Sequence, residues 1–232
     1  LDSNKYQVAA HKANRFLLKP KEGMKIKNLS TISLKRIESI KSWIQSFDSF
    51  DDLYLQLDDI LTNLKFGVKA DRFENAFDEL AQILGFPSQR PDKEWKEGPD
   101  NLWKIKDNDY LFIECKNNVD ISRTEINKEE TGQMNNSIAW FEKVHGNVSV
   151  KRIMVIPTKK VARAAGFNES VQIMRDKNLR TLTKNVRNFY FEFKRLDLQN
   201  LSDLRIQELL STYKLTSEDL TSELYSEEPK IY

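Results

Sequence analysis

Apolar residues in the N-terminal part of the chain recur at intervals of three and four, which predicts two amphipathic helices between Leu29 and Leu64. The polar stretch from Asp48 to Asp51 separates them, and Asp51 or Asp52 is a candidate cap for the second. We interpret residues 1–68 as an N-terminal helical subdomain. Its apolar positions are Leu34, Ile37, Ile40, Ile44, Phe47, Leu53, Leu57, Ile60 and Leu61.

The middle of the chain changes from helical to strand periodicity. The segment DRFENAFDELAQILGF predicts a helix capped by Asp71, and NLWKIK and DYLFIEC around KDND predict a β-hairpin. A helix over Glu125–Val144 and a strand over Val150–Ile156, which Pro157 ends, follow. Further helices are expected over Glu169–Asp176, Leu182–Leu196 and Leu201–Tyr213, while LRTLT adds a strand or joins helices.

This order of elements predicts an α/β fold. Residues 69–200 form its core, and residues 201–232 form a C-terminal helical extension. With 39% hydrophobic and 31% charged residues, the chain has the composition of a globular protein. No apolar run is long enough for a membrane span and no signal-peptide core is present, so we expect a cytoplasmic protein without a membrane partner.

Few metal-binding side chains other than carboxylates are available. The single cysteine excludes an intrachain disulfide and a thiolate zinc cage, and two histidines give little support to an imidazole site. The net charge of +2 does not by itself indicate nucleic-acid binding. Any basic footprint must therefore be local.

Charged residues flank the predicted hairpin. Asp100 enters its first strand, and Glu114 and Lys116 leave its second. Because side chains at i and i+2 point to the same side of a strand, Glu114 and Lys116 should project together, with Cys115 on the opposite side. An acid and an amine would then share one patch.

Together these segments resemble the PD-(D/E)xK nuclease superfamily over about residues 71–157. The resemblance rests on a helix containing Phe73-Glu74, the run GPDNLW, the tetrapeptide IECK and a later helix with an early glutamine. It implies a restriction-endonuclease-like mixed sheet flanked by helices. Asp100 and Glu114 would be the metal-binding acids, Lys116 the catalytic lysine, and the carbonyl of Cys115 a further metal ligand.

Two weaker assignments follow from the same resemblance. Glu74 matches an acid that holds a metal through water, and Gln133 matches a glutamine that positions the lysine or a phosphate. The GPDNLW run and Trp140-Phe141 also resemble nuclease-like domains attached to helicases or other proteins in bacterial defence systems. A helicase or other protein partner, or a fused domain, is therefore expected, and a homodimer would supply the two cuts that double-strand cleavage needs.

The chemistry of these residues suits Mg²⁺, for which Mn²⁺ would substitute. Mg²⁺ prefers hard oxygen ligands and retains waters, so two carboxylates and a carbonyl leave room for phosphate and water. Lys116 would stabilise developing charge or position the nucleophile. The expected function is hydrolysis of phosphodiester bonds in DNA; the alternative is a nuclease-like module that binds nucleic acid or a protein without cutting.

Each assignment has a structural alternative. Glu114 and Lys116 would alternatively be a solvated surface pair, and Pro91-Asp92 is a rival for Pro99-Asp100. Glu74 and Gln133 are equally explained as exposed helix residues. Cys115, Trp140 and Phe141 fit the core better than a reactive or base-stacking role, and His145 fits a helix end.

A phosphate-binding face is the expected route to DNA contact. Its candidate residues are Lys159, Lys160, Arg163, Arg175, Lys177, Arg180, Lys184 and Arg187. The alternative is a set of solvated faces balanced by nearby acids.

Overall fold

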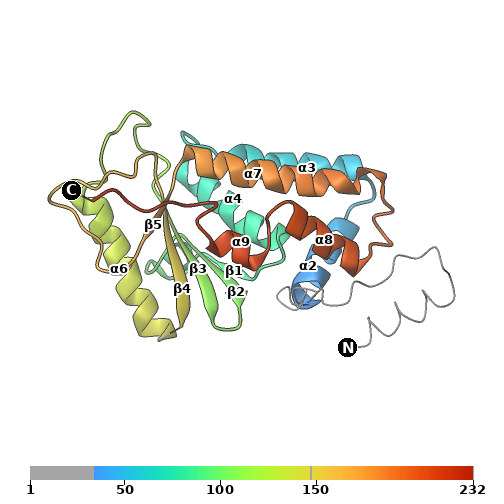
Figure 1. Cartoon of the computed structure of the whole chain (residues 1–232), viewed down its shortest axis with the longest axis horizontal. Coiled ribbons are helices and arrows are strands. Elements are labelled where there is room, and N and C mark those ends of the chain that lie inside the picture. Colours follow the sequence, from blue (N-terminus) through green and yellow to red (C-terminus); the bar gives the residue numbers. More distant parts are fainter. Residues whose placement is uncertain (1–33, 147, 232) are drawn as a thin grey trace, which may run out of the picture. The chain divides into compact units, whose positions relative to one another are not determined.

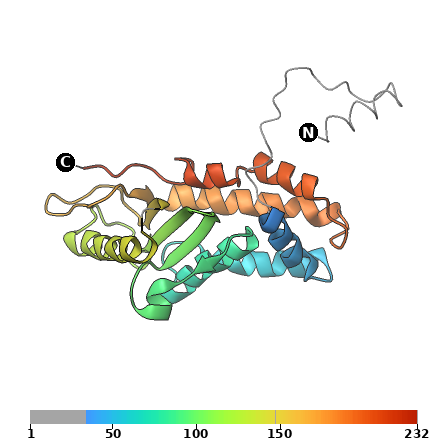
Figure 2. The ribbon, with the colours of Figure 1, turned by 90° about the horizontal axis from the view of Figure 1, so that it is seen from below.

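The fold is a five-stranded mixed sheet with helices on both faces. The structure is a computed structural model that describes residues 34–146 and 148–231 (Figures 1 and 2). The strands lie side by side in chain order; β2 is antiparallel to both of its neighbours, whereas β3, β4 and β5 are parallel to one another. They are β1 (Ser88–Gln89), β2 (Asn101–Lys106), β3 (Asp109–Cys115), β4 (Ser149–Val155) and β5 (Gln172–Met174). The predicted α/β class is confirmed.

The two faces of the sheet are covered unequally. A single long helix, α6 (Lys128–His145), packs on one face against Leu102, Phe112 and Met154. The opposite face carries Trp103 and Ile113 into a larger core. That core is shared by α2 (Leu34–Gln45), α3 (Phe50–Asn63), α4 (Ala70–Ile83), α7 (Asp176–Phe191), a 3₁₀ turn (Glu192–Arg195), α8 (Asp203–Thr212) and α9 (Ser217–Thr221). Successive side chains of the hairpin point to opposite faces of the sheet, and apolar residues occur at both sets of positions, so each face contributes to a core.

The first two described helices confirm the predicted division near residue 48. The cap differs, because Ser49 Oγ accepts from Asp52 N at 3.2 Å, whereas Asp51 and Asp52 lie in the first turn. Buried residues of α2 and α3, such as Ile40 and Leu57, belong to the same core as those of α4 and α7. Residues 1–33 of the predicted subdomain lie outside the described residues.

Three sequence predictions about elements were wrong. Residues 169–176 contain the short strand β5, because Val171, Ile173 and Met174 are buried against β4, where Ile153 pairs with Gln172 in parallel. The LRTLT segment lies inside α7, which begins at Asp176. Asp71 does not cap α4; Lys69 holds the cap position, and Asp71 accepts from Arg90 and Lys93.

The chain after α9 forms an extended strap rather than further helix. Ile173 and Glu227 exchange both backbone hydrogen bonds, at 2.8 and 2.9 Å, so the strap pairs with β5 (Figure 2). The Glu227 carboxylate also accepts from Lys159 and Arg175, at 2.8 and 2.6 Å, and pairs with Lys177 at 3.1 Å. Although burial opposes it, hydrogen bonding to these cations lowers the pKa of Glu227 from 4.5 to about 2.

Replacing Glu227 by Gln should destabilise the fold in a pH-dependent way. Because the folded-state pKa is depressed, the stabilisation is complete above pH 4.5 and is lost as pH falls towards about 2. We expect Glu227→Gln to lower the free energy of unfolding by about 1–2 kcal/mol at pH 7 and by less at pH 3. Urea denaturation at both pH values measures this. The control is Glu228→Gln at the neighbouring exposed position; equal effects of the two changes would contradict the role of Glu227.

Candidate active site

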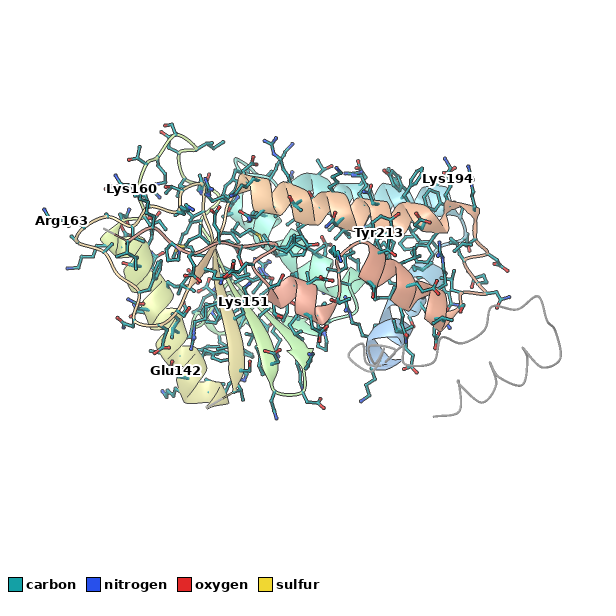
Figure 3. The ribbon with its side chains drawn as sticks, viewed as in Figure 1. Glu142, Lys151, Lys160, Arg163, Lys194 and Tyr213 are labelled. Atoms are coloured by element: carbon teal, nitrogen blue, oxygen red, sulfur yellow. The ribbon has the colours of Figure 1, made fainter. Side chains whose placement is uncertain are left out.

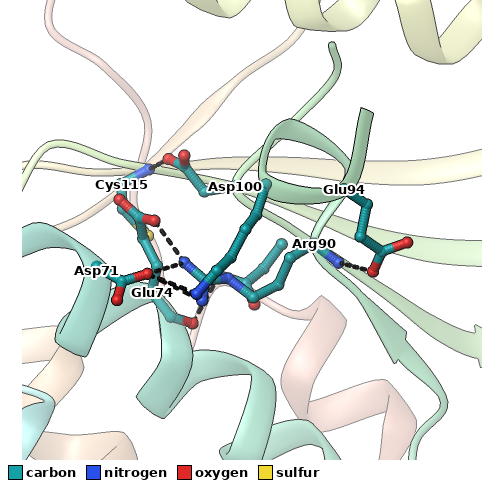
Figure 4. Close-up of polar contacts among 8 residues, drawn as sticks. Asp71, Glu74, Arg90, Glu94, Asp100 and Cys115 are labelled. Carbon is teal, nitrogen blue, oxygen red and sulfur yellow. Dashed lines mark hydrogen bonds and ion pairs between the residues drawn. The ribbon is translucent and has the colours of Figure 1, made fainter. Parts of the chain in front are cut away.

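The hairpin brings Asp100 and Glu114 together. Asn101 pairs with Ile113 across β2 and β3, so the next positions along the same register are Asp100 and Glu114. The backbone N–H of Cys115 donates to Asp100 Oδ2 at 2.6 Å, which fixes that carboxylate beside β3 (Figure 4). The predicted encounter of these two acids is therefore a consequence of strand pairing.

Glu114 and Lys116 project to the same side, as predicted. Lys116 Nζ lies 2.9 Å from Glu114 Oε1, and Ser137 Oγ on α6 lies 3.4 Å from Oε2. Glu114 is only 5% exposed, so the pair is not a solvated surface contact. The Cys115 side chain lies in the core on the opposite face, and burial raises the pKa of its thiol well above the usual value. A nucleophilic thiolate is therefore disfavoured.

Burial and like charge shape the titration of the two acids. Burial raises the pKa of Asp100 well above its usual value, and the neighbouring carboxylates Glu114 and Glu74 raise it further. Burial also raises the pKa of Glu114, against the opposing effect of Lys116. Burial opposes charge on Lys116, but Glu114 and Asp100 outweigh it and raise its pKa. Additional positive charge near Asp100 would relieve this repulsion.

Glu74 is held in an ion pair on α4. Its carboxylate lies 2.6 Å from Arg90 NH2, and the Arg90 side chain is only 7% exposed (Figure 4). Asn101 Nδ2 also donates to the Glu74 carbonyl oxygen at 3.1 Å, which connects α4 to the start of β2. A water-mediated metal contact from Glu74 stays a prediction.

The acids and Lys116 open into a pocket of about 720 Å³ between the hairpin, α6 and the loop before β2. Gln133 lines this pocket, as the resemblance implied, whereas Glu74 does not. Its lining residues are Asp92, Lys96, Glu97, Gly98, Asp100, Glu114, Lys116, Gln133, Asn136, Ser137, Ala139, Trp140 and Lys143.

Sequence reasoning missed several of these residues. Gln133, Ser137 and Trp140 follow one another at i, i+4 and i+7 on α6, so helical spacing from Gln133 was the signal that could have found the other two. Asp92 also lines the pocket, and its charge contributes to the raised pKa of Glu114. The rival acid therefore lies in the same site rather than outside it.

The loop before β2 is fixed against α6. The short helix α5 (Pro91–Trp95) ends at Lys96, whose φ of 62° is left-handed, and Gly98 follows with φ 87°. A Cβ on Gly98 would lie 2.6 Å from the Trp140 ring, so only glycine allows this approach. The Gly98 carbonyl also accepts from Ser137 Oγ at 3.1 Å. These contacts position Asp100 two residues later.

Asp100 and Glu114 supply two of the oxygen ligands that a hard divalent cation such as Mg²⁺ needs. The two carboxylates raise each other's cost of ionisation, and such an ion keeps several waters. No three His, Cys, Asp or Glu side chains within residues 34–146 and 148–231 gather closely enough to form a metal cluster. The Cys115 carbonyl as a further ligand stays a prediction.

Most of the predicted phosphate-binding face is neutralised by acids. Lys159, Arg175 and Lys177 surround Glu227, Lys160 pairs with Glu125 at 2.7 Å, Arg180 pairs with Asp176 at 2.8 Å, and Arg187 pairs with Asp58 at 2.6 Å. Arg163 projects outward from the loop after β4 (Figure 3). The pattern favours solvated faces balanced by nearby acids.

Comparison of the chain with protein-family models, with curated proteins and with solved structures finds no match in any of the three. The resemblance to PD-(D/E)xK nucleases therefore stays a prediction.

In the part of the chain that the structure describes, no helix has the length and apolar character to span a membrane.

Replacing Asp100 by Asn should stabilise the fold while removing its response to Mg²⁺. The raised folded-state pKa means that Asp100 costs stability as pH rises through that pKa, and Asn can still accept from Cys115 N. We expect Asp100→Asn to melt about 2–4 °C higher at pH 8, with a smaller difference at pH 4. Differential scanning fluorimetry with and without Mg²⁺ measures both effects, and the native chain alone should be stabilised by the ion.

Asp107→Asn, in the hairpin turn, is the matched control because Asp107 is fully exposed and does not line the pocket. It should leave both the melting temperature and the Mg²⁺ response unchanged. A Mg²⁺ response that persists in Asp100→Asn would place the ion elsewhere.

Proposed function

We propose that this protein is a metal-dependent nuclease that hydrolyses phosphodiester bonds in DNA, with Asp100, Glu114 and Lys116 as its catalytic centre. One observation carries the proposal: the half-buried carboxylate of Asp100, the buried carboxylate of Glu114 and a lysine ammonium 2.9 Å from Glu114 open into a single pocket at the adjacent ends of paired strands. This is a constellation of titratable groups with perturbed pKa values in a concave site, which is typical of active sites.

Each residue has a separate role in the proposed reaction. Asp100 and Glu114 hold the divalent ion, and Lys116 donates a hydrogen bond to charge that develops on the phosphate. Gln133 contacts the phosphate or the attacking water from α6. Bound Mg²⁺ would supply charge neutralisation and a lower pKa for water.

Hydrolysis adds one water across the bond. The water oxygen bonds to phosphorus, the bond from phosphorus to the 3′ oxygen breaks, one water proton leaves to solvent and the 3′ oxygen takes up a proton. No covalent intermediate with the enzyme is needed.

The resemblance to PD-(D/E)xK nucleases supports the same roles for Asp100, Glu114 and Lys116. It extends the proposal to a restriction-endonuclease-like fold and to a role in defence or DNA processing beside a helicase or another protein. Strand register supports this carry-over, since the Asp of GPD and the Glu of IECK lie at partner positions.

A second candidate is a nuclease-like module that binds nucleic acid without cutting. The arrangement of Glu74 favours it, because Arg90 already neutralises an acid that the nuclease reading assigns to the metal. Metal-dependent cleavage separates the two.

Lys116→Ala should abolish cleavage. We expect at least a 100-fold loss of the rate on supercoiled plasmid and labelled single-stranded DNA with Mg²⁺ or Mn²⁺, because the variant lacks the donor for developing charge. EDTA should abolish cutting by the native chain. The control is Lys104→Ala on the same hairpin, where the lysine lies 3.9 Å from the turn residue Asp107 and outside the pocket.

Two results would decide against this function. Cleavage that continues in EDTA, or that is equal in Lys116→Ala and Lys104→Ala, would remove the proposed centre. DNA binding by a folded native chain that never cuts would support the second candidate.

A further inference from the structure

Two tryptophans form an aromatic surface, one of them lining the pocket and the other stacked on it. The rings of Trp95 and Trp140 stack with centroids 6.0 Å apart and an interplanar angle of 28°. Trp140 lines the pocket, and Trp95 is 51% exposed. Sequence reasoning placed Trp140 in the core beside Phe141, but only Phe141 is fully buried. The exposed Trp95 ring, backed by the partly buried Trp140, is an aromatic surface beside a polar pocket on which a π-face can stack.

This surface lies one helical turn from the carboxylates. Ser137 Oγ is 3.4 Å from Glu114, Trp140 follows it on the same face of α6, and Lys143 follows Trp140. With a rise of about 1.5 Å per residue, the three Cα atoms span about 9 Å along the helix axis. A group resting on the tryptophans would therefore be close to a phosphate contacted by Lys116, which lies 2.9 Å from Glu114.

Cations flank the tryptophans. Lys96 and Lys143 both line the pocket and, within the described ranges 34–146 and 148–231, neither forms an ion pair. Lysines 159 and 177, by contrast, are engaged by Glu227. Lys96 and Lys143 thus place positive charge for phosphates beside the tryptophans; among the described residues of the predicted basic face, Arg163 and Lys184 also form no ion pair.

We propose that Trp95 and Trp140 are a stacking platform for an unpaired base of single-stranded DNA, with Lys96 and Lys143 contacting phosphates on either side of that base. This rests on the proposed function, because the strand on the platform is the one that would be cut. Bases inside a duplex have both faces covered by their neighbours, whereas an unpaired base offers a free face for stacking on an aromatic side chain. The platform therefore selects single strands or locally opened duplexes as the substrate class.

The test compares affinities for a fluorescein-labelled oligothymidylate and for a duplex of equal length by fluorescence anisotropy. It is made in Mg²⁺ with Lys116→Ala as the background, so that cleavage does not interfere. Adding Trp95→Ala should weaken binding of the single strand about 5- to 100-fold, as expected for loss of one stacked base, and change duplex binding by less than about 3-fold. Trp95→Phe should restore most of the affinity.

Phe191→Ala is the matched control, because Phe191 is also aromatic and is 52% exposed on α7, away from the pocket. It should bind both DNAs like its parent. Thermal melting of all variants identifies any that do not fold, and Trp95→Phe keeps the test informative if Trp95→Ala is unfolded.

Lys96 gives an independent test, because its left-handed φ of 62° is a conformation that glycine adopts without strain. Lys96→Gly should therefore leave the melting temperature unchanged or higher while weakening single-strand binding. The slope of log Kd against log salt should fall by about one, since one phosphate contact is lost. An unchanged slope would remove Lys96 from the interface.

The outcomes separate this inference from the proposed function. Cleavage by the native chain with equal binding by Trp95→Ala and Phe191→Ala would overturn the platform and leave the nuclease intact. Single-strand binding that depends on Trp95, without cleavage by the native chain, would support the platform and contradict the nuclease. Equal loss of duplex and single-strand binding in Trp95→Ala would overturn the selectivity for unpaired bases.

Discussion

The pairing of β2 with β3 brings two carboxylates beside each other, the half-buried Asp100 and the buried Glu114. Burial and mutual repulsion raise the pKa of Asp100, and the hydrogen bond from Cys115 N offsets only part of this cost. The surrounding structure accommodates the conflict through Lys116 and through the Gly98 loop packed on α6. A positively charged ligand would relieve this repulsion, which is what the proposed metal centre requires.

The hairpin and the placement of its charged residues were predictable because the signals are local. Alternation in NLWKIK and DYLFIEC, with turn residues between them, sets the strand ends, and the end positions determine that Asp100 meets Glu114. The period of two likewise separates Cys115 from Glu114 and Lys116. The strand that ends at Val155 was predicted for the same reason, since a short apolar run is followed directly by a proline.

The remaining features depend on contacts between distant segments. β5 has three residues and is a strand only because β4 and the strap around Glu227 pair with it, so helical spacing misled the prediction there. Arg90 and Glu74 meet across 16 positions, and no local pattern indicates that pair. The stack of Trp95 on Trp140 depends on how α5 packs against α6. Because of this packing Trp140 lines the pocket, although a large aromatic side chain is expected in the core.

The most direct test of the central claim is a crystal structure of the native chain soaked in Mn²⁺, with anomalous scattering used to locate the ion. The proposed centre predicts an anomalous peak about 2.2 Å from oxygens of both Asp100 and Glu114, with Lys116 beside it. A well-ordered site without such a peak, in which Lys116 remains paired with Glu114, would contradict a metal-dependent centre at this hairpin.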